Sequence, residues 1–166
     1  MNFNFLIIAI AAIVPILTGF IWYNPKVFGT AWMNSAGLTE EQLKASNMGK
    51  ILLAAFVMSF FLAFSLQFMV IHQFSVYSVL ANEPGINDPT SEMGMWLKEF
   101  MGKYGNNFRT FKHGALHGTI SGFFFAMPLI GINAVFERKG FKYIAIHTAY
   151  WMLTMAIMGG IICAFA

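Results

Sequence analysis

Four long apolar runs constrain the fold of this chain more than any other feature of its sequence. They cover residues 3–23, 51–71, 115–136 and 143–165, and none of them contains Asp, Glu, Lys or Arg. An α-helix needs about 20 apolar residues to cross a hydrocarbon core of about 30 Å, so each run is long enough. The sequence therefore predicts an all-α polytopic membrane protein with four transmembrane helices, in a single membrane domain over residues 1–166.

The composition suits lipid rather than water. Hydrophobic residues make up 58% of the chain and charged residues 10%, whereas soluble domains carry about 25% charged residues. The net charge is +3, but the basic residues lie at the edges of the apolar runs, where they anchor helices to head groups. We therefore expect the lipid bilayer as partner and no nucleic acid. The first run lacks the basic start of a signal peptide and continues past Pro15, so it is expected to be a retained span.

The connections between the runs predict the topology. Residues 137–142 alone separate the third run from the fourth, so these helices are antiparallel neighbours, and we expect two antiparallel hairpins in all. The first and third connections hold the larger share of basic residues, namely Lys26, Lys44, Lys50, Arg138, Lys139 and Lys142. Under the positive-inside rule both termini lie outside, in what we expect to be the cytoplasmic (inner) membrane of a bacterium.

Both longer connections are predicted to contain helices. In the outer loop, residues 73–113, aromatic residues recur at spacings of three or four and predict an amphipathic helix along Trp96, Phe100, Tyr104, Phe108 and Phe111. This helix is expected to lie on the outer leaflet or over the bundle mouth, with docking of a partner as the alternative. In the first connection, Thr39 and Gln42 have capping-box spacing, and we expect that helix to run on toward Lys50.

Small residues recur every four positions and predict close helix packing. Because lipid is as apolar as the helices, transmembrane association depends on such close contacts and on interhelical hydrogen bonds. The same stripes could equally serve a homo-oligomer, and the sequence leaves this open. They are Gly114, Gly118, Gly122 and Ala126; Ala156, Gly160 and Ala164; and Ala55, Ser59 and Ala63.

Three histidines are expected at the outer end of the bundle. His72 follows the second run, while His113 and His117 stand one helical turn apart at the start of the third. Three imidazoles and an open position would form a metal site of the kind that metal enzymes use, and haem ligation is a variant of this hypothesis. Alternatively, these side chains only anchor helix ends at the membrane boundary. We predict no cofactor, with the metal or haem as the alternative.

A second polar group is expected at the inner end. It forms an aromatic and polar belt in which Asn133 and His147 are predicted to share a hydrogen bond and Glu137 to stabilise a cation. The structural alternative is a clasp that fixes the helix ends at head-group level. The belt consists of Trp22, Tyr23, Pro25, Gly29, Trp32, Asn133, Glu137 and His147.

Motifs at the helix ends resemble a family of bacterial membrane proteins known as domain of unknown function 1761. The resemblance rests on Trp22-Tyr23-x-Pro25-x-x-Phe28-Gly29-x-x-Trp32, with support from His117-Gly118, from Pro128 with Asn133, and from Phe136-Glu137-Arg138. It covers all four runs. The resemblance implies a four-helix membrane protein and assigns no activity.

Three functions remain open from the sequence. The first is a non-enzymatic four-helix bundle that passes or senses a small solute or acts as a membrane scaffold, because the spans contain no carboxylate or lysine and no nucleophile beside a base. The second is a metal- or haem-binding protein, possibly catalytic, that uses His72, His113 and His117. The third is a subunit that docks a larger partner through the outer helix. The substrate is not determined.

Overall fold

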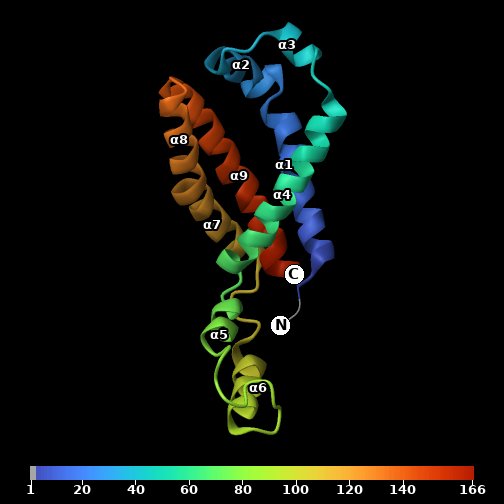
Figure 1. Cartoon of the computed structure of the whole chain (residues 1–166), viewed down its shortest axis with the longest axis vertical. Coiled ribbons are helices and arrows are strands. Elements are labelled where there is room, and N and C mark those ends of the chain that lie inside the picture. The colour runs from blue at the N-terminus through green and yellow to red at the C-terminus, as the bar shows by residue number, and fades with distance from the viewer. Residues whose placement is uncertain (1–2) are drawn as a thin grey trace.

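The computed structural model describes residues 3–166, and over these residues the chain is helical with no strand. Four helices are long and apolar enough to cross a membrane (Figure 1). They are α1 (Phe5–Trp22), α4 (Met48–Val70), the continuous helix Phe111–Phe136, and α9 (Phe141–Phe165). The third comprises α7 (Phe111–Ser121), the π-helical turn η2 (Gly122–Ala126) and α8 (Met127–Phe136). The predicted all-α membrane fold is confirmed.

The shorter helices lie at the two ends of the bundle (Figure 1). The start of α1 and the C-terminus lie toward the end from which α5 (Gln73–Val79) and α6 (Glu92–Tyr104) project. At the other end lie the π-helical turn η1 (Pro25–Gly29), α2 (Thr30–Ala36), α3 (Glu40–Lys44) and the connection from α8 to α9. The chain starts and finishes at the same end of the bundle because four crossings, an even number, return it to the side from which it started.

Two sequence predictions about the connections need correction. The capping box of Thr39 and Gln42 is present, but α3 ends at Lys44, and the Asn47 side chain caps the separate helix α4 by accepting a hydrogen bond from the Lys50 N–H. Two local caps thus divide what the sequence suggested was one helix.

The predicted aromatic stripe of the outer loop is also interrupted. Trp96, Phe100 and Tyr104 lie one after another along α6, with ring centroids 5.2 and 5.0 Å apart. Phe108 instead lies in a turn with φ of 62°, and Phe111 begins α7. A left-handed residue ends the helical geometry, so the stripe is divided between two helices and a turn.

Helix α9 occupies a central place, because it packs against α7, α1 and α4. Its closest neighbour is α7, and glycines of α7 and of the following η2 face it directly. A Cβ added at Gly118 would overlap the carbonyl oxygen of Met155, and one added at Gly122 would lie 2.6 Å from Cα of Met152. The predicted glycine stripe therefore serves packing within the chain. The division into two separate hairpins stays a prediction, since α9 also contacts α1.

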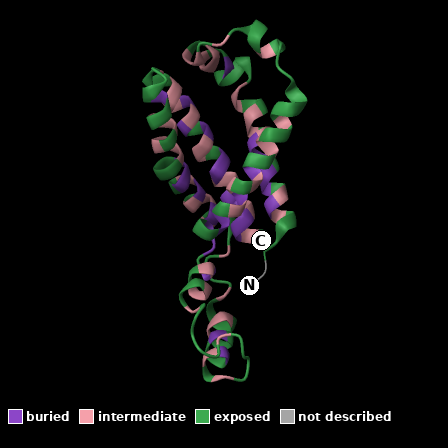
Figure 2. Ribbon diagram, viewed as in Figure 1, coloured by how far each residue is buried: buried purple, intermediate pink, exposed green. Residues whose placement is uncertain are grey.

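The buried residues gather where α1, α4 and α9 come together, toward the end that holds the termini (Figure 2). This core contains Ile8, Leu66, Val70, Met158 and Ile162. The outward faces of the spanning helices are also apolar, with exposed side chains such as Leu53, Phe124 and Leu129. An apolar exterior over four long helices is what a lipid environment requires.

Candidate functional site

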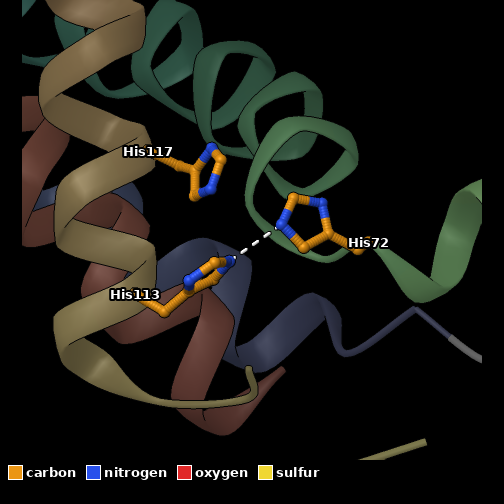
Figure 3. A group of neighbouring side chains, drawn as sticks. All are labelled: His72, His113 and His117. Carbon is orange, nitrogen blue, oxygen red and sulfur yellow. Dashed lines mark hydrogen bonds between the residues drawn. The ribbon is translucent and has the colours of Figure 1, made fainter. Parts of the chain in front are cut away.

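The three outer histidines converge at the end of the bundle from which α5 projects. His72 lies between α4 and α5, whereas His113 and His117 lie on α7, and their imidazole rings point toward one another (Figure 3). Nε2 of His113 and Nε2 of His72 are 2.8 Å apart. One nitrogen from each of the three rings lies within 4.8 Å of the others. We call these three residues the histidine group.

Local capping explains why two of these side chains share a face. Thr110 accepts a hydrogen bond from the His113 N–H at 3.2 Å, so α7 begins at Phe111, four residues before the apolar run that the sequence shows. His113 and His117 are then both helical and one turn apart. Their ring centroids lie 4.5 Å from each other.

The third histidine comes from the chain reversal after α4. That helix ends at Val70, and the N–H of Ile71 still donates to the carbonyl oxygen of Gln67. His72 follows at the exposed start of α5, and its ring centroid lies 4.9 Å from that of His113 and 4.8 Å from that of His117. A residue 41 positions away in the sequence thereby completes the group.

The histidine group can be reached from water and contains only neutral nitrogen ligands. His72 is exposed, and the other two side chains are half-buried. Within residues 3–166, no carboxylate or thiol belongs to the group. The ring of Phe108 lies beside it, 5.0 Å from the ring of His113, and sequence reasoning missed this neighbour because it placed Phe108 on a helix.

The turn beside the histidine group is tied to the bundle. The side-chain amide of Gln73 donates to the carbonyl oxygen of Asn107 at 2.9 Å. Arg109 donates to the carbonyl oxygens of Cys163 and Ala166 near the end of α9. Both chain segments that connect α5 and α6 to the membrane helices thus pass close to the histidine group. We call these two segments, residues 71–73 and 105–110, the neck.

The inner belt is partly assembled. Tyr23 and His147 share a hydrogen bond of 2.8 Å between the hydroxyl and Nδ1, and the Tyr23 ring lies 5.0 Å from that of Trp32. Trp22 lies against Phe28, with ring centroids 4.4 Å apart. These contacts join the end of α1 to α2 and α9.

Steric contacts in the chain reversal after α1 explain the spacing of Pro25, Gly29 and Trp32 in the inner belt. Pro25 begins η1, and the N–H of Gly29 donates to the carbonyl oxygen of Asn24 at 2.9 Å. A Cβ at Gly29 would overlap the carbonyl oxygen of Tyr23 and lie 2.7 Å from the carbonyl carbon of Asn24. Only glycine fits this tight turn, which directs Trp32 back toward Tyr23.

Two members of the predicted belt lie at this end of the bundle but are exposed. They are Asn133 on α8 and Glu137 just after it, and Glu137 forms no ion pair in the described part of the chain. The predicted hydrogen bond between Asn133 and His147 is wrong, because Nδ1 of His147 is bonded to Tyr23 and its Nε2 has no protein partner. Membrane depth alone does not specify on which side of α8 a side chain lies, because that depends on how the helix packs.

A pocket of about 840 Å³ opens beside the inner belt. Its walls come from four segments, namely α1 with the residues just after it, Trp32 of α2, the stretch from Leu43 through α4 to Leu62, and Tyr150 and Trp151 of α9. The Tyr150 hydroxyl donates to the carbonyl oxygen of Pro15 at 2.7 Å. Sequence reasoning did not find this pocket, since its residues come from four separate segments.

Fold and surface together define an integral membrane protein with four membrane-spanning helices. A family model described as "Protein of unknown function (DUF1761)" matches residues 6–163, nearly the whole chain, and the protein belongs to this family. The resemblance seen in the helix-end motifs is thereby confirmed. No curated protein and no solved structure matches the chain.

Proposed function

We propose that this protein binds a transition-metal ion through His72, His113 and His117 at the end of the bundle. Among the functions left open by the sequence, the geometry favours this one. The observation that carries it is the convergence of three histidine nitrogens, one from each residue, within 4.8 Å of one another. His72 lies far from the other two in the sequence, so local helix periodicity alone does not produce this arrangement.

The spacing of the nitrogens is compatible with a tetrahedral ion. Zn²⁺ binds histidine nitrogen at about 2.0–2.1 Å, which places two nitrogens in a tetrahedral site about 3.4 Å apart. In the histidine group, Nε2 of His113 and Nε2 of His72 are 2.8 Å apart, and no two of the three ligand nitrogens are more than 4.8 Å apart. Rotations of the exposed and half-buried histidine side chains would bring each nitrogen–nitrogen distance to about 3.4 Å without moving a helix.

The ligand set favours some metals over others. Imidazole suits Zn²⁺, Cu²⁺, Ni²⁺ and Fe²⁺, whereas Mg²⁺ and Ca²⁺ prefer oxygen ligands, which the histidine group lacks. Three neutral ligands leave the charge of the ion uncompensated and a fourth position open to water or an anion. No carboxylate belongs to the group among the described residues. We therefore infer reversible metal binding or sensing, and metal-assisted catalysis at the open position is the alternative, since a metal-bound water can ionise without a carboxylate ligand.

We also propose an orientation in the membrane. One end of the bundle holds α2, α3, the start of α4 and the connection between α8 and α9 (Figure 1). The segments at this end carry Lys26, Lys44 and Lys50 and the basic residues of that connection, whereas the histidine group lies at the end from which α5 projects. Positive charge favours the cytoplasmic side, so the histidine group and both termini face outward from the cytoplasmic membrane of a bacterium. Reporter fusions active on one side of the membrane, placed at the C-terminus, test this. Activity of a cytoplasm-specific reporter would contradict it.

The remaining functional alternatives concern partners. A homo-oligomer would need the small residues of α4 or the outer surface, since the glycine stripe of α7 already packs against α9. Docking of a larger protein would use the aromatic face of α6. A haem would occupy the same histidine group, and an absorption spectrum of the purified protein separates it from a colourless ion.

Metal binding is tested by titrating the purified, chelator-treated protein with Zn²⁺ and measuring bound metal by elemental analysis. We expect one ion per chain, with loss of binding in His113→Ala/His117→Ala and weaker binding in His72→Ala. His147→Gln is the matched control, because this histidine lies at the opposite end and should leave the stoichiometry unchanged. A protein that takes up no metal, or a double variant that binds as well as the parent, would refute the proposal.

A further inference from the structure

The large pocket between α1 and α4 has the character of a ligand site. Its volume of about 840 Å³ falls within the range of about 300–1,000 Å³ that is usual for small-molecule pockets. The walls are mostly aliphatic and aromatic, with Phe20, Leu52, Ala55, Met58 and Trp151 among them. Such walls favour an apolar occupant over a polar one.

The pocket is long and follows the direction of the membrane normal. Along α4 its lining extends from Met48 to Leu62, a rise of about 21 Å at 1.5 Å per residue. One leaflet contributes about 15 Å to the hydrocarbon core. Asn24 and Ser46 line the pocket outside the ends of the spanning helices, whereas Pro15 lies near the middle of α1. The pocket therefore reaches from head-group level to about the membrane centre.

Water is a poor occupant of this space. The hydroxyl of Tyr23 is bonded to His147, and the hydroxyl of Tyr150 is bonded to the carbonyl oxygen of Pro15. A water molecule in a cavity needs two to four polar partners, and the deep walls provide few that are not already paired. A hydrocarbon chain gains dispersion contacts with the same walls without losing hydrogen bonds.

We propose that the pocket holds one acyl chain of a glycerophospholipid from the leaflet at the α2–α3 end, with the head group beside Asn24 and Ser46. The terminal methyl of the chain lies near Trp151, at the deep end. The bound lipid then fills the space that α1 and α4 leave between them and supports their separation near Tyr23. This site is independent of the histidine group, which lies at the other end of the bundle.

The test uses phospholipids with bromine atoms at known positions of the acyl chain, because bromine quenches tryptophan fluorescence on contact. Replacement of Trp22, Trp32 and Trp96 by Phe leaves Trp151 as the only one of the four tryptophans. In the reconstituted protein, we expect bromine near the methyl end to quench Trp151 more strongly than bromine near the glycerol. Equal quenching by all positions would overturn the proposal.

Two further variants distinguish a chain in the pocket from bulk lipid around the protein. Ala55→Phe fills the pocket and should abolish the additional quenching by methyl-end bromine. Leu53→Phe is the matched control, because Leu53 lies on the same helix, is 66% exposed and does not line the pocket. Equal quenching in both variants would overturn the proposal, as would emission typical of water-exposed tryptophan. If Ala55→Phe does not fold, the smaller Ala55→Leu replaces it in the same comparison with Leu53→Phe.

Discussion

The close approach of α7 and α9 predicts opposite effects for one substitution at two glycines. A Cβ at Gly118 would overlap the carbonyl oxygen of Met155 and lie 2.6 Å from its carbonyl carbon and 3.0 Å from Cα of Ala156. All of these are backbone atoms, which cannot rotate away as a side chain does. The Gly118→Ala variant therefore folds only if α7 and α9 separate.

The magnitude follows from two opposing contributions. Overpacking in a well-packed interior costs about 1–3 kcal/mol, whereas Ala in place of Gly within a helix gains about 0.5–1 kcal/mol. We expect Gly118→Ala to lower the free energy of unfolding by about 0.5–2 kcal/mol. At Gly131, in α8, an added Cβ meets nothing within 4 Å. Gly131→Ala should therefore raise the free energy of unfolding by up to about 1 kcal/mol, since only the helical preference of Ala contributes.

The assay is unfolding in mixed micelles with increasing dodecyl sulfate, followed by helical circular dichroism. We expect the midpoint of Gly118→Ala to fall below that of the parent and the midpoint of Gly131→Ala to equal or exceed it. If both midpoints shift in the same direction by the same amount, the glycine contact does not determine the approach of α7 to α9, and the steric reasoning is refuted.

Three further predictions concern other parts of the molecule. Tyr23→Phe removes the hydrogen bond to His147 and should cost about 0.5–1.5 kcal/mol in the same unfolding assay, whereas an unchanged midpoint would contradict a contribution from this bond. Added Zn²⁺ should slow amide hydrogen exchange in the neck, residues 71–73 above all because His72 would be a ligand, and equal slowing without two of the three histidines would contradict the link to the site. Hydrogen bonds from Thr90 lower the pKa of Asp88, so the turn they form should persist above the carboxyl's unfolded pKa, about 3.9, and loosen as the pH falls through its folded pKa. Local hydrogen exchange measured against pH, with Asp88→Asn as the pH-insensitive comparison, checks this.

Several features follow from the sequence because they depend on local patterns. The four apolar runs determine four spanning helices, since no other structure satisfies backbone hydrogen bonds in lipid over such lengths apart from closed barrels. The capping box at Thr39 and the i, i+4 spacing of His113 and His117 are equally local. Their structural consequences could be read from a few neighbouring residues.

Helix ends and single side-chain partners were less predictable. The break between Lys44 and Asn47 depends on a cap that competes with helix continuation, and the positive φ of Phe108 interrupts an otherwise regular aromatic stripe. The hydrogen bond predicted between Asn133 and His147 was wrong because membrane depth specifies a layer and not a direction around the helix.

The sequence by itself determined the membrane class, the number of crossings and the family of this protein. Only the tertiary structure decided that His72 meets His113 and His117, and that a long apolar pocket opens between α1 and α4. The physical reason is the range of the interactions. Apolar length and helix caps act within a few turns, whereas the rotation and depth of each helix are set by contacts such as that of Gly118 with α9. Those contacts place distant side chains together, and the candidate metal site depends on them.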